Sequence, residues 1–100
     1  MAYKIIWSPE ALETFDDIID YLSRMFTQRE VAKFVGIVNR RLLLLQQIPQ
    51  SFRTTARTSR RRRTVLHKRA ILFYTVRGRK REVELLFFFN TRQNPTKTNF

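Results

Sequence analysis

Two strongly apolar segments near the C-terminal end constrain the fold of this chain more than any other feature. They cover residues 71–76 and 83–89, and a short basic connector containing Gly78 joins them. Their content of Ile, Val, Phe and Tyr is typical of a pleated sheet, so the sequence predicts a β-hairpin. The second segment is apolar on both faces apart from Glu84, which is unusual for a sheet with one face in water. We therefore expect helices of the chain to cover one face and a partner to cover the other.

The N-terminal half predicts one short strand and two helices. Residues 3–7 are rich in aromatic and β-branched side chains, as in a strand. Ser8 is a typical N-cap in front of Pro9, and apolar residues spaced by three and four continue the first helix to about residues 24–26. A second helix begins after Thr27, another N-cap, and ends before Pro49. Because the connection is short, the two helices should form an antiparallel hairpin.

The order of these elements predicts an α+β fold, β-α-α-β-β-β. A short strand at residues 64–66 precedes the central hairpin, and the stretch before it, residues 50–59, is expected to be a loop. The helical hairpin should pack on one face of a small, mostly antiparallel sheet. One hundred residues are enough for one domain, residues 1–100, in which residues 91–100 form a polar tail.

The charge distribution is strongly one-sided. Twenty Lys and Arg stand against eight acids, which gives a formal net charge of +12. Five of the acids lie in the first predicted helix, whereas residues 51–81 contain twelve basic residues and no acid. We interpret the acids as a solvated helix face. The basic half favours a partner that is a polyanion or an acidic protein.

Composition also limits the possible chemistry. The chain has no cysteine, which excludes disulfides, thiolate metal sites and a catalytic thiol. One histidine cannot build a metal site, and no motif indicates a cofactor. The N-terminus lacks a signal peptide, and no segment has the length of a membrane span. We expect a soluble cytoplasmic protein with no membrane contact, metal or small-molecule cofactor.

An ordered set of motifs resembles a known family. It comprises a short N-terminal strand, S-P-E-A opening an acidic helix, a second helix ending in L-x-x-I-P, the strand R-x-x-x-x-x-x-x-I-L-F-Y-x-V, and the ending F-x-x-N-T-R-Q-N-P. Across about residues 3–97 this set is similar to the RelE/ParE superfamily of bacterial toxins, and its ending is similar to the ParE-like branch. The resemblance implies a type II toxin–antitoxin module, in which an acidic antitoxin neutralises the toxin.

The resemblance leaves three functions open. ParE-like toxins poison DNA gyrase, whereas RelE-like toxins cut messenger RNA on the ribosome; a third alternative is an inactive homologue that only binds its antitoxin. RNA cleavage requires proton carriers. This sequence has Ile71 where RelE-like enzymes typically carry a basic residue, and its C-terminal region lacks the aromatic hydroxyl or imidazole that they carry. We therefore expect a ParE-like inhibitor that is not an enzyme, with the nuclease as the alternative.

These hypotheses predict roles for individual residues. Tyr74 is interpreted as a core residue with a hydrogen-bonded hydroxyl. If the protein is a nuclease, the candidate catalytic residues are His67, Lys68, Arg69 and Arg92. Residues expected to bind the target or the antitoxin are basic side chains near the strands, together with two apolar side chains of the last strand: Arg57, Arg60, Arg61, Arg62, Arg63, Lys68, Arg69, Leu86, Phe88 and Arg92.

Overall fold

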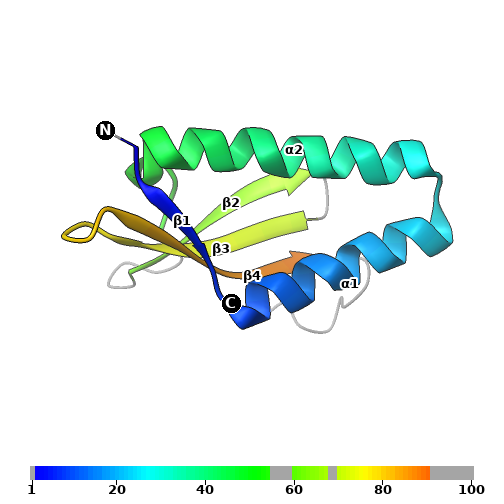
Figure 1. Ribbon diagram of the computed structural model, residues 1–100, viewed down its shortest axis with the longest axis horizontal. Coiled ribbons are helices and arrows are strands. Elements are labelled where there is room, and N and C mark those ends of the chain that lie inside the picture. Colours follow the sequence, from blue (N-terminus) through cyan, green and yellow to red (C-terminus); the bar gives the residue numbers. More distant parts are fainter. Residues whose placement is uncertain (1, 55–59, 68–69, 91–100) are drawn as a thin grey trace.

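The computed structural model describes residues 2–54, 60–67 and 70–90. In chain order its elements are β1 (Lys4–Trp7), α1 (Pro9–Met25), α2 (Gln28–Gln47), the single 3₁₀ turn η1 (Pro49–Ser51), β2 (Arg61–His67), β3 (Ala70–Arg77) and β4 (Glu82–Asn90) (Figure 1).

Both predicted helix starts are confirmed by their caps. The Ser8 hydroxyl accepts a hydrogen bond from the amide of Ala11 at 3.0 Å and donates one to the carbonyl of Leu86, also at 3.0 Å. The same side chain therefore caps α1 and attaches it to β4. Thr27 accepts from the amide of Glu30 in the first turn of α2.

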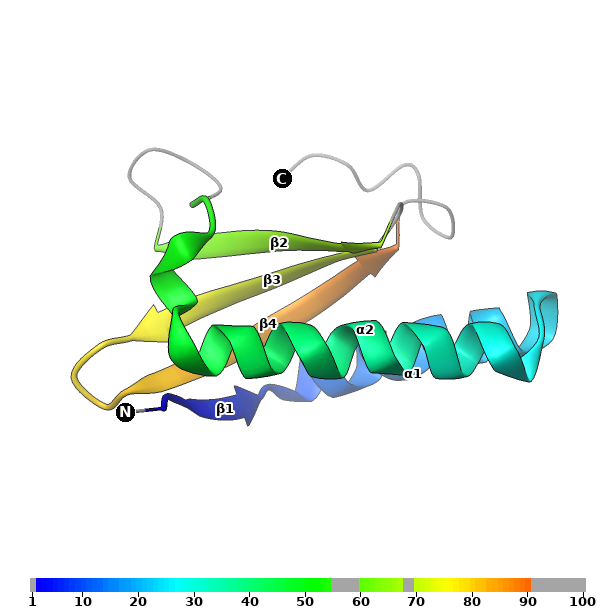
Figure 2. The same ribbon diagram turned by 90° about the horizontal axis from the view of Figure 1, so that it is seen from above.

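The four strands form one mixed sheet in the order β1-β4-β3-β2. The predicted hairpin, β3 and β4, is at its centre and is antiparallel, whereas β1 runs parallel to β4. Strand β2 lies at an edge and begins at Arg61, three residues earlier than the sequence predicts. Helices α1 and α2 cover one face of the sheet, as expected (Figures 1 and 2).

The core lies between this sheet face and the two helices. Leu72, Tyr74 and Leu85 are fully buried beneath Val38 and Leu45 of α2. Burial of these apolar side chains, at roughly 1.5–3 kcal/mol each, is the main source of stability. Toward α1 the core is aromatic, with ring contacts among Trp7, Phe15, Phe34 and Phe88.

A β-bulge in β4 decides which aromatic side chains face the helices. Tyr74 pairs with Leu85 and Phe73 pairs with Phe87, so Leu86 is an extra residue between the two pairs. Strict alternation would place Leu86 and Phe88 together on the face away from the helices. Because of the bulge, Phe88 instead faces α1 and is only 3% exposed. Among the described residues, no helix is long and apolar enough to cross a membrane.

Candidate functional site

The sheet face opposite the helices carries an aromatic pair beneath an arginine. The rings of Phe73 and Phe87 stack with their centroids 4.7 Å apart. The guanidinium of Arg61 lies over both rings, 5.3 Å from the centroid of Phe73 and 6.0 Å from that of Phe87. Such cation–π contacts hold the guanidinium against the face of the sheet.

This face is less accessible than the sequence predicts. Phe73 is 1% exposed and Phe89 is 7% exposed, so the expectation of a bare apolar face is wrong for these two side chains. Phe88 does not belong to this face at all, because the bulge turns it into the core beside Trp7 and Phe15. It is therefore not available to a partner in this conformation. Leu86 is half-buried, and its carbonyl accepts the bond from Ser8.

The four consecutive arginines at the start of β2 have different roles. Arg62 is structural, since its guanidinium donates to the carbonyls of Gln50 at 3.2 Å and Phe52 at 2.6 Å. Arg61 covers the aromatic pair. Arg60 and Arg63 are exposed, and within the described part of the chain neither forms an ion pair. In the predicted arginine cluster, Arg60 and Arg63 are therefore accessible to a partner, whereas Arg62 binds the preceding segment of the chain.

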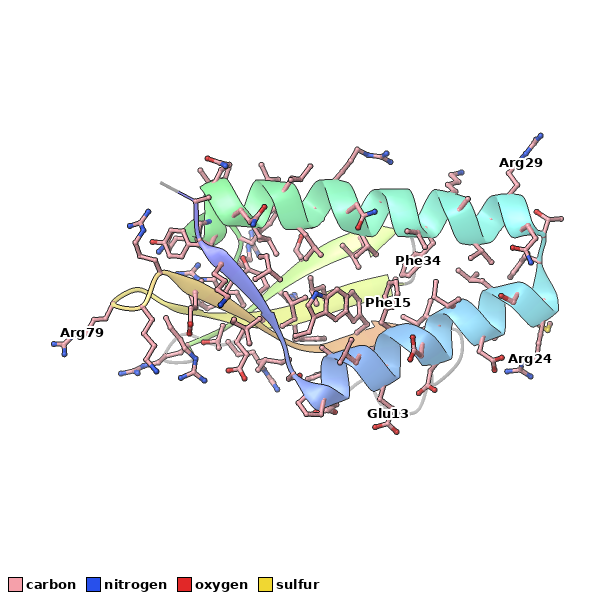
Figure 3. The ribbon with its side chains drawn as sticks, in the orientation of Figure 1. Glu13, Phe15, Arg24, Arg29, Phe34 and Arg79 are labelled. Carbon is pink, nitrogen blue, oxygen red and sulfur yellow. The ribbon has the colours of Figure 1, made fainter. Side chains whose placement is uncertain are left out.

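The connection between β3 and β4 adds cations that the sequence-based set of binding residues omits. Arg79 and Lys80 are exposed there, and Arg79 points away from the molecule at one extreme end (Figure 3). Arg77 is engaged by Glu84 at 2.5 Å, and the hydrogen bond and charge of Glu84 raise the pKa of Arg77. In the sequence these two cations belong to the basic connector, which predicted a turn and no binding role.

The left-handed position of this turn is occupied by an arginine and not by its glycine. Gly78 has no positive φ, whereas Arg81 adopts the left-handed region with φ of 52°. The amide of Arg81 donates to the carbonyl of Gly78 at 3.2 Å, and its guanidinium lies 4.6 Å from the ring centroid of Tyr3. The cation–π contact and the turn bond offset the cost of a left-handed non-glycine residue. Through Arg81, the turn therefore contacts Tyr3, the residue directly before β1.

A cavity of about 350 Å³ lies between the helices and the ends of the strands opposite to this turn. His67 is exposed at its margin on β2, and Asn90 at the end of β4 also contributes. The cavity is lined by apolar side chains and a few polar ones: Ile18, Tyr21, Leu22, Phe26, Glu30, Lys33, Phe34, Ile37, His67, Ala70 and Asn90. This mixture is suited to an amphipathic side chain of a partner rather than to a metal.

The structure assigns Tyr74 to the core, as predicted. It is fully buried, and its hydroxyl donates to the carbonyl of Pro49 at 2.7 Å. Burial raises the pKa of Tyr74 to about 12, although the charges of Arg62 and Arg41 oppose this shift. A hydroxyl that is committed to a backbone carbonyl and holds its proton this strongly is unsuited to proton transfer near neutral pH.

Arg57, Lys68, Arg69 and Arg92 lie outside the described residues. Across residues 2–54, 60–67 and 70–90, no cluster of three or more acidic or histidine side chains could hold a metal ion. The described part of the site is therefore a set of exposed cations around a covered aromatic face, with a cavity at the far end of the sheet.

Comparisons with known proteins agree with this architecture. Residues 5–95 match a family model described as the ParE toxin of the type II toxin–antitoxin system parDE. No curated protein sequence matches the chain.

Solved structures share the fold at low sequence identity. A chain of the chromosomal ParDE toxin–antitoxin system from P. aeruginosa superposes with a TM-score of 0.72 at 19% identity, covering 89% of this chain and 96% of that one. A chain of the RelBE2 toxin–antitoxin complex from Mycobacterium tuberculosis gives 0.65 at 13% identity, covering 90% and 99%. A mutant of E. coli RelE in the free state gives 0.62 at 14% identity, covering 95% and 90%.

Proposed function

Because this chain belongs to the ParE toxin family of type II toxin–antitoxin systems, we propose that it arrests growth by trapping DNA gyrase on cleaved DNA. The match of the family model over residues 5–95 is the observation that carries this proposal. An acidic antitoxin would hold the toxin inactive. The proposed target places its action in the cytoplasm.

The state of the candidate proton carriers supports an inhibitor that does no chemistry of its own. RNA cleavage by attack of the 2′-hydroxyl needs one group to take a proton and another to give one. The Tyr74 hydroxyl is bonded to Pro49 inside the core. The aromatic residues of the sheet face opposite the helices, Phe73 and Phe87, carry no hydroxyl. A toxin that traps another enzyme requires only a binding surface.

Assays with purified gyrase test this proposal. The full-length chain, in stoichiometric excess, is expected to stop supercoiling of relaxed plasmid and to accumulate linear DNA after denaturation of the enzyme. Relaxation by a type I topoisomerase is the control and should continue. Full gyrase activity at the same excess would refute the proposal.

We further propose that Arg60 and Arg63 pair with carboxylates of the antitoxin. Both side chains are exposed beside the aromatic face, and Arg can bind a carboxylate with two parallel hydrogen bonds. The double variant Arg60→Ala/Arg63→Ala should weaken the complex with the acidic protein encoded next to this chain and flatten its salt dependence. Arg24→Ala/Arg29→Ala removes the same charge from the helical hairpin as a matched control. Equal affinity of both variants and the parent would contradict the pairing.

A ribosome-dependent endoribonuclease is the second candidate, and one observation favours it. His67 is the one histidine of the chain, and its imidazole, a group that can both accept and donate a proton, is exposed at the margin of the cavity. This function predicts message cuts at preferred codons during induced expression and their loss in His67→Ala. Intact transcripts during growth arrest would exclude it. If expression without antitoxin causes no arrest, the remaining candidate is an inactive homologue that only binds its antitoxin.

A further inference from the structure

Exposed cations gather at one end of the molecule. They lie just before β2, within β2 and in the β3–β4 connection, and Figures 1 and 2 place this connection opposite to the α1–α2 turn. Within the described residues none of them forms an ion pair. We define the basic end by these five side chains: Arg53, Arg60, Arg63, Arg79 and Lys80.

The acids near the basic end do not neutralise it. Glu84 is engaged by Arg77, and Glu82 lies beside Lys4 in the register of β1 with β4. The other acids of the described chain are on α1 and at the start of α2. The five cations therefore add their fields with little local opposition, and such a field attracts polyanions over several ångströms in solution.

The surface composition of the β3–β4 connection favours a nucleic acid over an acidic protein as its partner. Protein interfaces contain a buried apolar centre, with charges mostly at the rim. The described large apolar side chains that are exposed lie on or beside the helices and at Val65 of β2, and none lies in the β3–β4 connection. A protruding turn that carries charge and no apolar anchor is suited to a phosphate backbone, where affinity comes from release of counterions.

The geometry favours a duplex over a single strand. Proteins that bind single strands present aromatic rings on which bases stack. Here Phe73 is 1% exposed, and Arg61 covers the rings of both Phe73 and Phe87. A two-stranded ribbon is roughly as wide as the major groove of B-DNA, about 12 Å, whereas the major groove of A-form RNA is too deep and narrow to admit it.

We propose that the basic end binds double-stranded DNA through its phosphates, with the β3–β4 connection directed at the groove. Contacts to phosphates carry no sequence information, so binding should be independent of sequence. The role of this binding in the cell rests on the proposed function: a toxin that traps gyrase on cleaved DNA would hold the DNA as well as the enzyme. Its test, however, requires no gyrase, so the two can fail separately.

Fluorescence anisotropy with a 20-base-pair duplex and the full-length chain tests the proposal. Five phosphate contacts predict a slope of log K against log salt of roughly −4 to −5, which is a loss of about 500-fold between 50 and 200 mM salt. Arg79→Gln/Lys80→Gln should reduce the slope by about 2 and weaken binding roughly 100-fold at 50 mM salt. Duplexes of unrelated sequence should bind equally.

Arg24→Gln/Arg29→Gln is the matched control, because it removes two exposed cations from the helical hairpin. Arg29 lies at the opposite end of the molecule from Arg79 (Figure 3). This control should retain binding within a few-fold. Equal losses in the two double variants would overturn the proposal, since binding would then reflect net charge alone.

Two further outcomes would also overturn it. Tighter binding of a single-stranded oligonucleotide or an RNA hairpin than of the duplex would assign the basic end to another nucleic acid. Displacement of the duplex by polyglutamate at equal charge from the Arg60→Ala/Arg63→Ala variant, which lacks the two arginines proposed to bind the antitoxin, would assign the rest of the basic end to an acidic protein. If the duplex binds as predicted but gyrase remains fully active, the DNA-binding surface stands and the proposed target is wrong.

Discussion

Replacing Tyr74 with phenylalanine separates a structural role of this tyrosine from a catalytic one. The change removes only the hydroxyl, which donates to the carbonyl of Pro49 at 2.7 Å in a fully buried position. The carbonyl of Pro49 would then be a buried acceptor without its donor, which costs about 1–3 kcal/mol. We expect Tyr74→Phe to lower the free energy of unfolding at pH 7 by about 2 kcal/mol.

The same variant changes the response to alkaline pH. Burial raises the pKa of Tyr74 to about 12, whereas in the unfolded chain this group has its ordinary value near 10. The stabilisation is fully present below pH 10. Above pH 10 the unfolded chain loses this proton first, so the parent loses stability by about 1.4 kcal/mol per pH unit up to about pH 12. A phenylalanine at this position cannot titrate, so the parent's advantage over Tyr74→Phe should shrink as the pH rises from 9 to 11.5.

Urea unfolding followed by the fluorescence of the single tryptophan measures both effects. Trp7 stacks on Phe88 with centroids 5.6 Å apart, so its emission reports on the core. Tyr21→Phe is the control. Tyr21 is half-buried with no hydroxyl bond to the described residues, and its replacement should change stability by less than about 0.5 kcal/mol.

Two results would refute this reasoning. The first is a stability of Tyr74→Phe equal to that of the parent at pH 7. The second is a difference between them that stays constant from pH 9 to 11.5. Arrest of growth should survive in Tyr74→Phe, because the hydroxyl is bonded inside the core; loss of arrest in a folded variant would make Tyr74 a catalytic candidate.

Four other substitutions test the packing and the helix cap. Phe88→Ala should cost about 3–5 kcal/mol in chemical unfolding because Phe88 fills the core beside Trp7; a small loss would place it on the open face after all. Arg62→Gln should lower stability by about 1–3 kcal/mol through loss of two bonds to backbone carbonyls, whereas Arg63→Gln should change it by less than about 0.5 kcal/mol; equal thermal shifts would contradict this division. Ser8→Ala should cost about 1–2 kcal/mol and speed amide exchange at the start of α1, and unchanged exchange would exclude the cap.

Local chemistry was sufficient to predict most of the elements. Ser8 and Thr27 identified the helix starts, because an N-cap hydroxyl satisfies an amide within its own turn. Pro49 identified the end of α2 at Gln47 because proline cannot continue a helix. The two apolar segments identified the central strands, since their composition suits a pleated surface covered on both faces. Strand β2 was predicted too short, because its arginines do not follow the apolar alternation that marks a strand.

The candidate site depended more on packing. The four consecutive arginines at residues 60–63 are chemically identical, and only their surroundings give them different roles. Arg62 binds backbone carbonyls and Arg61 lies over aromatic rings, whereas the other two are exposed. The exposed pair in the β3–β4 connection, Arg79 and Lys80, was visible in the sequence as a basic turn. Its position at one extreme end of the molecule was not visible, because that depends on how far the hairpin projects beyond its neighbours (Figure 3).

The sequence alone determined the class of this protein: the order of its elements, the helical layer on one side of a hairpin-centred sheet, and the concentration of positive charge in the second half. These follow from composition, periodicity and capping, which act between residues near each other in the chain. Only the tertiary structure decided which side chains of β4 face away from the helices. The extra residue Leu86 reverses the alternation, so Phe88 enters the core and Phe87 takes the outer face. A bulge is defined by the register between two paired strands, so the sequence of β4 alone does not determine its position.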